Sequence, residues 1–430
     1  MTAYKLTWRM DFFLSKFISA AHNHRTDEYG DNSENRARVL GEILDKIRDA
    51  VGRDFCVIAK INGDDFTDGG LNILLEIIRK KSKCGVEMKN IFDEMTLNRL
   101  KLKNRLFRSA TWLALADEEG NLTEPIFDTY RELAKGGVGA IVTGITTVSP
   151  HDAYLDGIAQ FYDDKFIEQH KKFTAMIHEY DCKIFMQTAL VDSVFYIDGE
   201  LYRMPITELT KAHIDEFVNL FAEGAVRAKK AGYDGVQIHV AHGFFLSKFI
   251  SAAHNQRTDE YGGNSENRAR VLGEILDKIR DAVGRNFCVI AKINGDDFTD
   301  GGLNIHDCIV ACKVMKAHGV DAIEISGNYT SREARAGANE GYFQKYAVAV
   351  KEKVDVPIIL VGGHRSVENM NGILFKTDIE FLSLSRALVR EPNIINRWQS
   401  GDIKPSACIG CNMCYRTPGH KCIFVLRGKK

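Results

Sequence analysis

The sequence predicts an α/β fold, a (β/α)8 TIM barrel that carries a duplicated N-terminal fragment and a short Cys-rich C-terminal tail. Three observations lead to this prediction. Eight short, β-branched apolar segments alternate with amphipathic helical segments over residues 88–400. The stretch 12–73 returns almost unchanged as 244–305. Four of the ten cysteines lie between Cys408 and Cys422.

The eight apolar segments are expected to form parallel strands. Helices between them, such as 207–232 and 265–284, have apolar residues at helical spacing and end at a Gly. Strands separated by helices pair in parallel, and eight such units favour ring closure. An open doubly wound sheet would need a Gly-rich phosphate turn after the first strand, and the sequence there, FRSATWLALAD, is not one. The expected strands are 105–110, 139–144, 183–188, 235–240, 288–293, 322–326, 357–363 and 381–385.

Near-identity in only two copies indicates a recent duplication or gene fusion rather than a repeat architecture, which stacks at least three units. Only the second copy follows a strand and two histidines, in GYDGVQIHVAH, so the second copy is expected to carry the chemistry. We therefore expect residues 1–87 to be an appended partial duplicate plus a linker, dispensable for cofactor binding. The barrel would span 88–400 and the tail 401–430. The alternative is that the fragment replaces the matching segment of another subunit.

The composition narrows the class of partner. Basic and acidic residues number 57 and 58, which leaves no electrostatic footprint for nucleic acid or an anionic membrane. No apolar run approaches the roughly 20 residues that span a bilayer. The N-terminal FFLSKFISAAH could pass for a weak signal peptide, but it recurs inside the chain. The prediction is a cytoplasmic protein with a small-molecule substrate, and homo-oligomerisation stays open.

Polar residues mark the carboxyl ends of several expected strands, where this fold places its reactive groups. Gln187 lies in the third strand, His239 ends the fourth with His242 three residues on, and Lys292 lies in the fifth. A Lys inside a barrel mouth is costly unless it meets a negative charge. Zinc at the two histidines would need a further ligand, and no carboxylate follows at helical spacing.

The last two expected strands end in glycines and a basic residue. Gly362 and Gly363 end the seventh strand, and Ser385 and Arg386 come at the end of the eighth. Glycines let backbone N–H groups approach a phosphate, and a guanidinium can donate two hydrogen bonds to its oxygens. The strand ends together predict a phosphorylated cofactor across the barrel mouth.

The text IHVAHGFFLSKFISAAHNQRTDEYGGNSENRARVL, residues 238–272, resembles the signature of the old yellow enzyme family of FMN-dependent ene-reductases. The likeness is greatest to the branch of NADH:flavin oxidoreductases related to dienoyl-CoA reductase and trimethylamine dehydrogenase. The resemblance implies hydride transfer from NADH or NADPH through flavin N5 to an activated alkene. It implies these roles: the backbone of Ala110 and Thr111 at the reactive edge of the flavin, Gln187 at its pyrimidine ring, Lys292 beside N1 and O2, Gly362, Gly363, Ser385 and Arg386 at the phosphate, and His239 and His242 polarising a substrate carbonyl.

Two residues depart from the family pattern. Phe244 stands where many members have a proton-donating Tyr, and Trp112 stands near the flavin where a smaller residue is common. Two alternatives therefore stay open. One is an amine or other substrate dehydrogenase that passes electrons to a cluster in the tail. The other, from a different class, is a (β/α)8 aldolase that uses Lys292 as a Schiff base.

The tail contains Cys408, Cys411, Cys414 and Cys422. Three thiols at two-residue gaps can converge on one face of a cluster, and a fourth can close it. The text CIGCNMC resembles the [4Fe–4S] motif of the iron–sulfur members of the family, although the fourth cysteine follows sooner here. A zinc site and free thiols are the alternatives.

Overall fold

The computed structural model forms two compact units, Met1–Met88 and Lys89–Lys430, which are considered separately. No helix in the described part of the chain is long and apolar enough to cross a membrane. The residues that the structure describes are 4–7, 13–52, 57–60, 89–152, 155–197, 200–328 and 339–428.

The first unit contains a two-stranded parallel sheet and two helices. Strand β1 (Tyr4–Thr7) pairs with β2 (Val57–Lys60). Between them in the chain lie α1 (Phe13–Ile18) and α2 (Ser33–Val51). Both helices fall within the stretch that the sequence repeats later, so the repeated text adopts helical structure here too.

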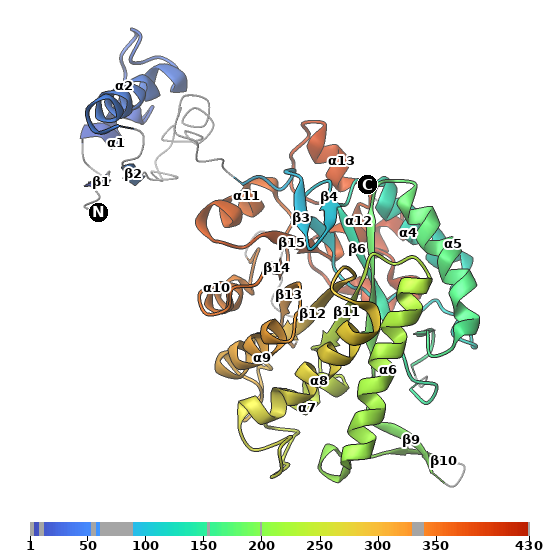
Figure 1. Ribbon diagram of the computed structural model, residues 1–430. Helices are drawn as coiled ribbons and strands as arrows, with labels where there is room; N and C mark the ends of the chain where they lie inside the picture. The colour runs from blue at the N-terminus through green and yellow to red at the C-terminus, as the bar shows by residue number, and fades with distance from the viewer. Residues whose placement is uncertain are drawn as a thin grey trace. The chain divides into compact units, whose positions relative to one another are not determined.

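The second unit is a closed ring of eight parallel strands (Figure 1). Neighbours in the ring follow one another in the chain, and the last strand pairs with the first, so the sheet has no free edge. The prediction of eight parallel strands in a barrel is confirmed. The ring consists of β5 (Leu106–Arg108), β6 (Ala140–Thr147), β8 (Lys183–Ala189), β11 (Gly235–Val240), β12 (Cys288–Asn294), β13 (Ala322–Ser326), β14 (Ile358–Val361) and β15 (Phe381–Leu384).

Helices cover the outside of the ring, and short strands add to its loops (Figure 1). A two-residue strand, β7 (Ala159–Gln160), extends the pairing of β6, and β9 (Val194–Ile197) and β10 (Glu200–Arg203) form a hairpin after β8. The helices are α4 (Glu124–Lys135), α5 (Ile167–His178), α6 (Lys211–Lys230), α7 (Phe245–Ile250), α8 (Ser265–Val283), α9 (Ile305–Ala317), α10 (Gln344–Lys351), α11 (Val367–Lys376), α12 (Arg386–Arg390), α13 (Ile394–Gln399) and α14 (Ile423–Leu426).

A hairpin that the sequence did not predict packs against one end of the barrel interior. Strands β3 (Met95–Leu97) and β4 (Leu100–Leu102) are antiparallel and only three residues each, too short for a periodic signal. Their buried Leu side chains join the apolar cluster inside the ring, which keeps water out of that end. The polar functional groups are thereby confined to the other end, where the strands finish. The buried members of this cluster are Leu97, Leu102, Phe107, Ala140, Val142, Phe185, Cys288, Ile290, Ala322, Ile359 and Phe381.

Helices α2 and α8 have the same 19-residue sequence but different surroundings. Each begins where an Asn side chain, Asn32 or Asn264, accepts a hydrogen bond from a backbone N–H of the first turn. In the barrel, α8 packs between α6 and α9, and Ile279 is fully buried. The matching Ile47 of α2 is only partly buried. The local sequence fixes the helix and its cap, and the neighbours fix how much of it is buried.

Replacing Ile279 with Val should lower the free energy of unfolding of the barrel by about 0.5–1.5 kcal/mol, because it removes a methylene from a filled core. Ile47→Val is the matched control, since it makes the same change in the same sequence at a partly exposed position. We expect it to cost about 0.5 kcal/mol or less. Urea unfolding followed by tryptophan fluorescence measures the change in unfolding free energy for each variant. Equal losses would contradict the difference in burial.

Candidate active site

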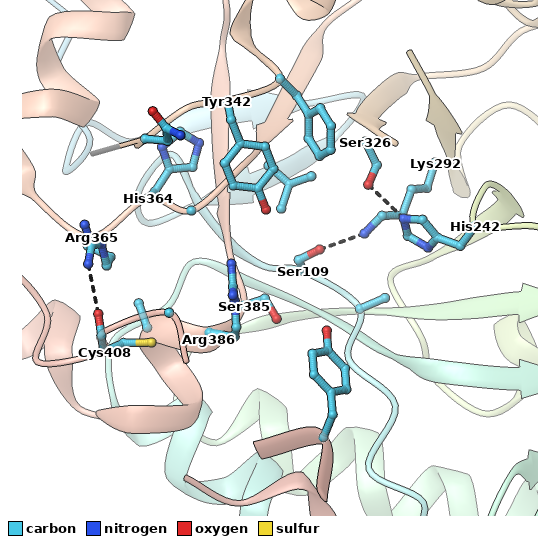
Figure 2. Close-up of a pocket in the computed structure, with 18 residues that line it drawn as sticks. Ser109, His242, Lys292, Ser326, Tyr342, His364, Arg365, Ser385, Arg386 and Cys408 are labelled. Carbon is cyan, nitrogen blue, oxygen red and sulfur yellow. Dashed lines mark hydrogen bonds between the residues drawn. The ribbon is translucent and has the colours of Figure 1, made fainter. Parts of the chain in front are cut away.

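The carboxyl ends of the strands open into a cavity of about 760 Å³, part of which is open to solvent. Figure 2 shows Lys292 and His242 at one end of this cavity and Cys408 at the other. The predicted site residues that line it are Ala110, His242, Lys292, Gly363, Ser385, Arg386 and Cys408. Those outside its lining are Thr111, Gln187, His239, Gly362, Cys411, Cys414 and Cys422. Lys292, in β12, and Arg386, the first residue of α12, thus share one basin.

Lys292 belongs to a buried network that the sequence did not predict. Its ammonium donates a hydrogen bond to Ser109 Oγ at 2.8 Å and lies 3.4 Å from Glu324 Oε1. The Ser109 hydroxyl donates its own hydrogen to the same carboxylate oxygen at 2.7 Å. The side chains of Lys292 and Glu324 are 4% and 1% exposed. This ion pair is therefore shielded from water, and each charge depends on the other.

The network continues through two glutamines to the next strands of the ring. Gln237 Nε2 donates to Glu324 Oε2 at 2.8 Å, and Gln187 Nε2 donates to Gln237 Oε1 at 2.8 Å. The backbone N–H of Gln187 donates to Thr143 Oγ1 at 3.0 Å. Both oxygens of Glu324 are occupied, and the side chain of Gln237 alone links Gln187 to the Lys292–Glu324 pair.

Sequence reasoning missed Ser109, Gln237 and Glu324, although a signal was present for two of them. Alternate residues of a strand face the same way, so Gln237 shares its direction with His239, and Glu324 shares its direction with Ser326. A polar residue that faces into a barrel needs a partner there. Strand alternation would therefore have marked both Gln237 and Glu324 as candidates.

His239 lies at the end of β11 and His242 in the turn that follows, with ring centroids 5.2 Å apart. Burial, with the nearby charge of Lys292, lowers the pKa of His242 to about 3, and burial lowers the pKa of His239 well below 6.5. Ser326 Oγ is 2.8 Å from His242 Nε2, and the buried His239 Nδ1 has no hydrogen-bond partner among the described residues. Near pH 7 both rings are neutral, so they can donate a hydrogen bond but do not carry a second proton.

The buried histidines predict that acid destabilises the fold. Burial lowers the pKa of His170 to about 3 and that of His364 to about 4. In the unfolded chain a His takes up its proton near pH 6.5. The free energy of unfolding should therefore be highest above about pH 6.5 and fall by a few kcal/mol as the pH drops from there toward 4.

Urea unfolding between pH 7.5 and 4.5 measures this slope. His364 Nε2 lies 3.1 Å from the carbonyl oxygen of Leu360, and Gln can keep a donor there without a titrating ring. His364→Gln should flatten the slope, whereas the same change at the exposed His306 should leave it unaltered. A wild-type profile that is flat from pH 6.5 to 4.5 would overturn the prediction.

The glycine turn after β14 lies beside the cavity. Gly363 has a φ of 74°, and a Cβ there would come within 2.8 Å of the Tyr342 ring. A side chain at this position would therefore be strained and would crowd the cavity wall. The Arg386 guanidinium faces the same space and donates to Asn412 of the tail. An unobstructed backbone and a guanidinium fit a phosphate at this end, and the Lys292 ammonium at the other end fits an electron-accepting ring.

The Cys-rich tail contacts the barrel near the cavity. Arg365 Nη1 donates to the carbonyl oxygen of Cys408 at 3.0 Å, and His420 Nδ1 is hydrogen-bonded to the carbonyl oxygen of Trp112. Burial raises the pKa of both the Cys408 and the Cys414 thiols. Within the described residues, no three His, Cys, Asp or Glu side chains are grouped closely enough to hold a metal ion. The described part of the structure therefore does not show a metal site at the four cysteines of the tail.

A closed parallel barrel whose mouth holds an ammonium, a neutral histidine and a glycine turn beside a guanidinium fits a phosphorylated ring cofactor. The chain belongs to the NADH:flavin oxidoreductase / NADH oxidase family, whose model matches residues 10–82 and 90–404. The predicted resemblance to this family is confirmed. The first matched range contains the first copy of the repeat, and the second contains the barrel.

Curated relatives agree with this assignment, and a solved structure shares the fold. A metal reductase of Desulforamulus reducens is 30% identical over 76% of the chain and 51% of the relative. An NADPH dehydrogenase of Bacillus subtilis (strain 168) is 31% identical over 71% of the chain and 92% of the relative. A 2-naphthoyl-CoA reductase structure superposes with a TM-score of 0.69 at 21% identity, covering 74% of this chain and 54% of that one. The chain spans about half the length of the first of these relatives.

Proposed function

We propose that the protein transfers hydride from NADH or NADPH, through bound FMN, to an activated alkene such as an α,β-unsaturated carbonyl compound. The observation that carries this proposal is the shared basin: Lys292 and His242 line the same cavity as Gly363 and Arg386. A phosphate and an electron-accepting ring could therefore be held at once. FMN, when bound, supplies the ring that accepts hydride from the nicotinamide and passes it on.

One group of residues would bind the phosphate of the cofactor, and another would bind its ring and the substrate. Gly362, Gly363, Ser385 and Arg386 would hold the phosphate, with backbone N–H groups and a guanidinium as donors. Ala110 and Thr111 would place their backbone at the edge of the ring. This end of the site binds and orients the cofactor and moves no proton.

At the other end, Lys292 and Gln187 would bind the pyrimidine side of the ring. A positive charge there stabilises the extra electron density that the ring gains on reduction. His239 and His242 would donate hydrogen bonds to the substrate oxygen. Their lowered pKa values keep them neutral, so they polarise the substrate without protonating it.

Phe244 limits which group can supply the proton that completes alkene reduction. Its ring lies 5.1 Å from that of His239, which is proposed to bind the substrate oxygen, and it has no proton to give. Trp112 and Phe244 pack against an apolar cluster that includes Ile145 and Val191. The substrate is therefore expected to be apolar around the reacting bond, with the proton coming from water or another acid.

A spectrum of the purified protein tests the proposal. We expect flavin absorbance that bleaches anaerobically on adding NADH or NADPH and returns on adding 2-cyclohexenone. Bleaching by trimethylamine, but not by a nicotinamide, would instead favour the amine dehydrogenase alternative. A colourless protein that takes up no added FMN would refute the proposal. Family membership disfavours the Schiff-base alternative, which would show as trapping of the substrate on Lys292 by borohydride.

We expect that removing residues 1–87 leaves flavin binding intact, because the groups proposed to hold FMN all lie in the second unit. The expected result is a protein starting at Met88 with the same flavin content per chain and the same thermal midpoint for the barrel. Absorbance measures the flavin content per chain, and a thermal melt measures the midpoint. A truncated protein that is unstable or free of flavin would show that the fragment supports the site.

The [4Fe–4S] cluster at Cys408, Cys411, Cys414 and Cys422 stays a prediction from the sequence. No step of the proposed reaction is routed through it. Iron and acid-labile sulfide in anaerobically purified protein would support it, zinc alone would favour a structural metal, and neither would favour free thiols.

A further inference from the structure

We propose that Glu324 is a positioning residue that fixes the Lys292 ammonium and offsets its charge. The ring-binding end of the cavity would then hold a buried neutral pair instead of a lone cation. This inference rests on the proposed function, because its consequence is a property of the bound flavin. It adds a residue that the family resemblance did not supply.

The contacts leave the ammonium little freedom. Of its three N–H groups, one donates to Ser109 Oγ and another can face Glu324 Oε1 at 3.4 Å. Ser109 has a single hydroxyl hydrogen, which goes to the same carboxylate oxygen. One N–H then remains for the cavity that Lys292 lines. Glu324 thus determines where the ammonium sits and which of its hydrogens is offered.

The same carboxylate sets the direction of the glutamine pair. A carboxylate only accepts hydrogen bonds, so Gln237 must turn its NH2 group toward Glu324 Oε2. The Gln237 carbonyl oxygen therefore faces Gln187, which donates to it. One side-chain N–H of Gln187 is used in this bond, and the side-chain oxygen of Gln187 can act as an acceptor. Reversing one amide would place two donors or two acceptors together.

The charge of the pair matters because both members are buried. A cation alone would stabilise the electron-rich reduced ring strongly. A carboxylate 3.4 Å from that cation opposes this effect, and little water intervenes to screen it. Removing the negative charge should therefore favour the reduced flavin. Removing the positive charge should disfavour it.

The test is the midpoint reduction potential of the flavin in the full-length FMN-loaded protein. Glu324→Gln keeps the shape and removes the charge, and it should shift the potential to a more positive value than in the wild type. Glu324→Asp keeps the charge and should restore most of the wild-type potential. Gln237→Met is the matched control: it removes an amide but no charge, and should shift the potential less. Equal potentials in the wild type and Glu324→Gln would overturn the inference.

A second comparison works even if Glu324→Gln does not fold. Lys292→Met should shift the potential to a more negative value, and the double variant Lys292→Met/Glu324→Gln should return it toward the wild type. A double variant with the same potential as Lys292→Met would show that Glu324 does not influence the site. If the wild-type protein binds no FMN, the proposed function fails and this inference fails with it. If FMN binds and the potentials do not move, the inference alone fails.

Discussion

Replacing Lys292 with Met is expected to lower the free energy of unfolding by about 3–5 kcal/mol, because the Glu324 carboxylate would stay buried without its cation. This loss of stability should exceed the net stabilisation that the Lys292–Glu324 ion pair provides in the wild type. Desolvating an unpaired charge costs far more than the net gain from a well-formed pair. Urea denaturation of the wild type and the variant measures the change.

The double variant Lys292→Met/Glu324→Gln separates this cause from a simple packing defect. With both charges gone, most of the lost stability should return. Lys292→Arg, which keeps the charge, should be less damaging than Lys292→Met. If the double variant were less stable than Lys292→Met, the carboxylate would not be the source of the loss.

Replacing His239 with Ala is expected to lower kcat/KM for 2-cyclohexenone about 100- to 1000-fold, the usual cost of losing one preorganised donor to a developing negative charge. Reduction of the flavin by the nicotinamide involves no substrate carbonyl, so its rate should change much less. Stopped-flow measurement of the two half-reactions distinguishes them. His239→Asn offers an N–H and should recover part of the loss.

The exposed His254 provides a control within the same stretch of sequence, and His254→Ala should leave both half-reactions unchanged. The pH dependence gives a separate check. Because the pKa of His242 is lowered to about 3, the rate of alkene reduction should not show a titration near pH 6.5 from either histidine. A rate that follows a single protonation near pH 6.5 would mean that a charged imidazole takes part.

Much of the fold could be predicted from the sequence. The eight strands alternate with helices, and both the apolar period and the Gly stops are local signals. The positions of Lys292, His242, Gly363 and Arg386 at the strand ends followed from this order, since parallel strands finish at one end of the barrel. The hairpin of β3 and β4 could not be predicted in the same way, because three-residue strands carry no period.

The partners of the site residues could not be read from the sequence. Ser109 and Glu324 are 215 positions apart, and they meet only because the ring closes between β15 and β5. Gln187 and Gln237 face each other because the register of β8 and β11 aligns them. Such pairings depend on register and closure, which are properties of the whole sheet.

The repeated stretch separates the two kinds of information within one chain. The sequence by itself determined that α2 and α8 are helices of the same length with the same Asn cap, because capping and helix propensity act over a few residues. Only the tertiary structure decided that Ile279 is fully buried and Ile47 is not. Burial requires a neighbouring surface, which α6 and α9 supply to α8. Identical residues thus became core in one place and remained partly exposed in the other.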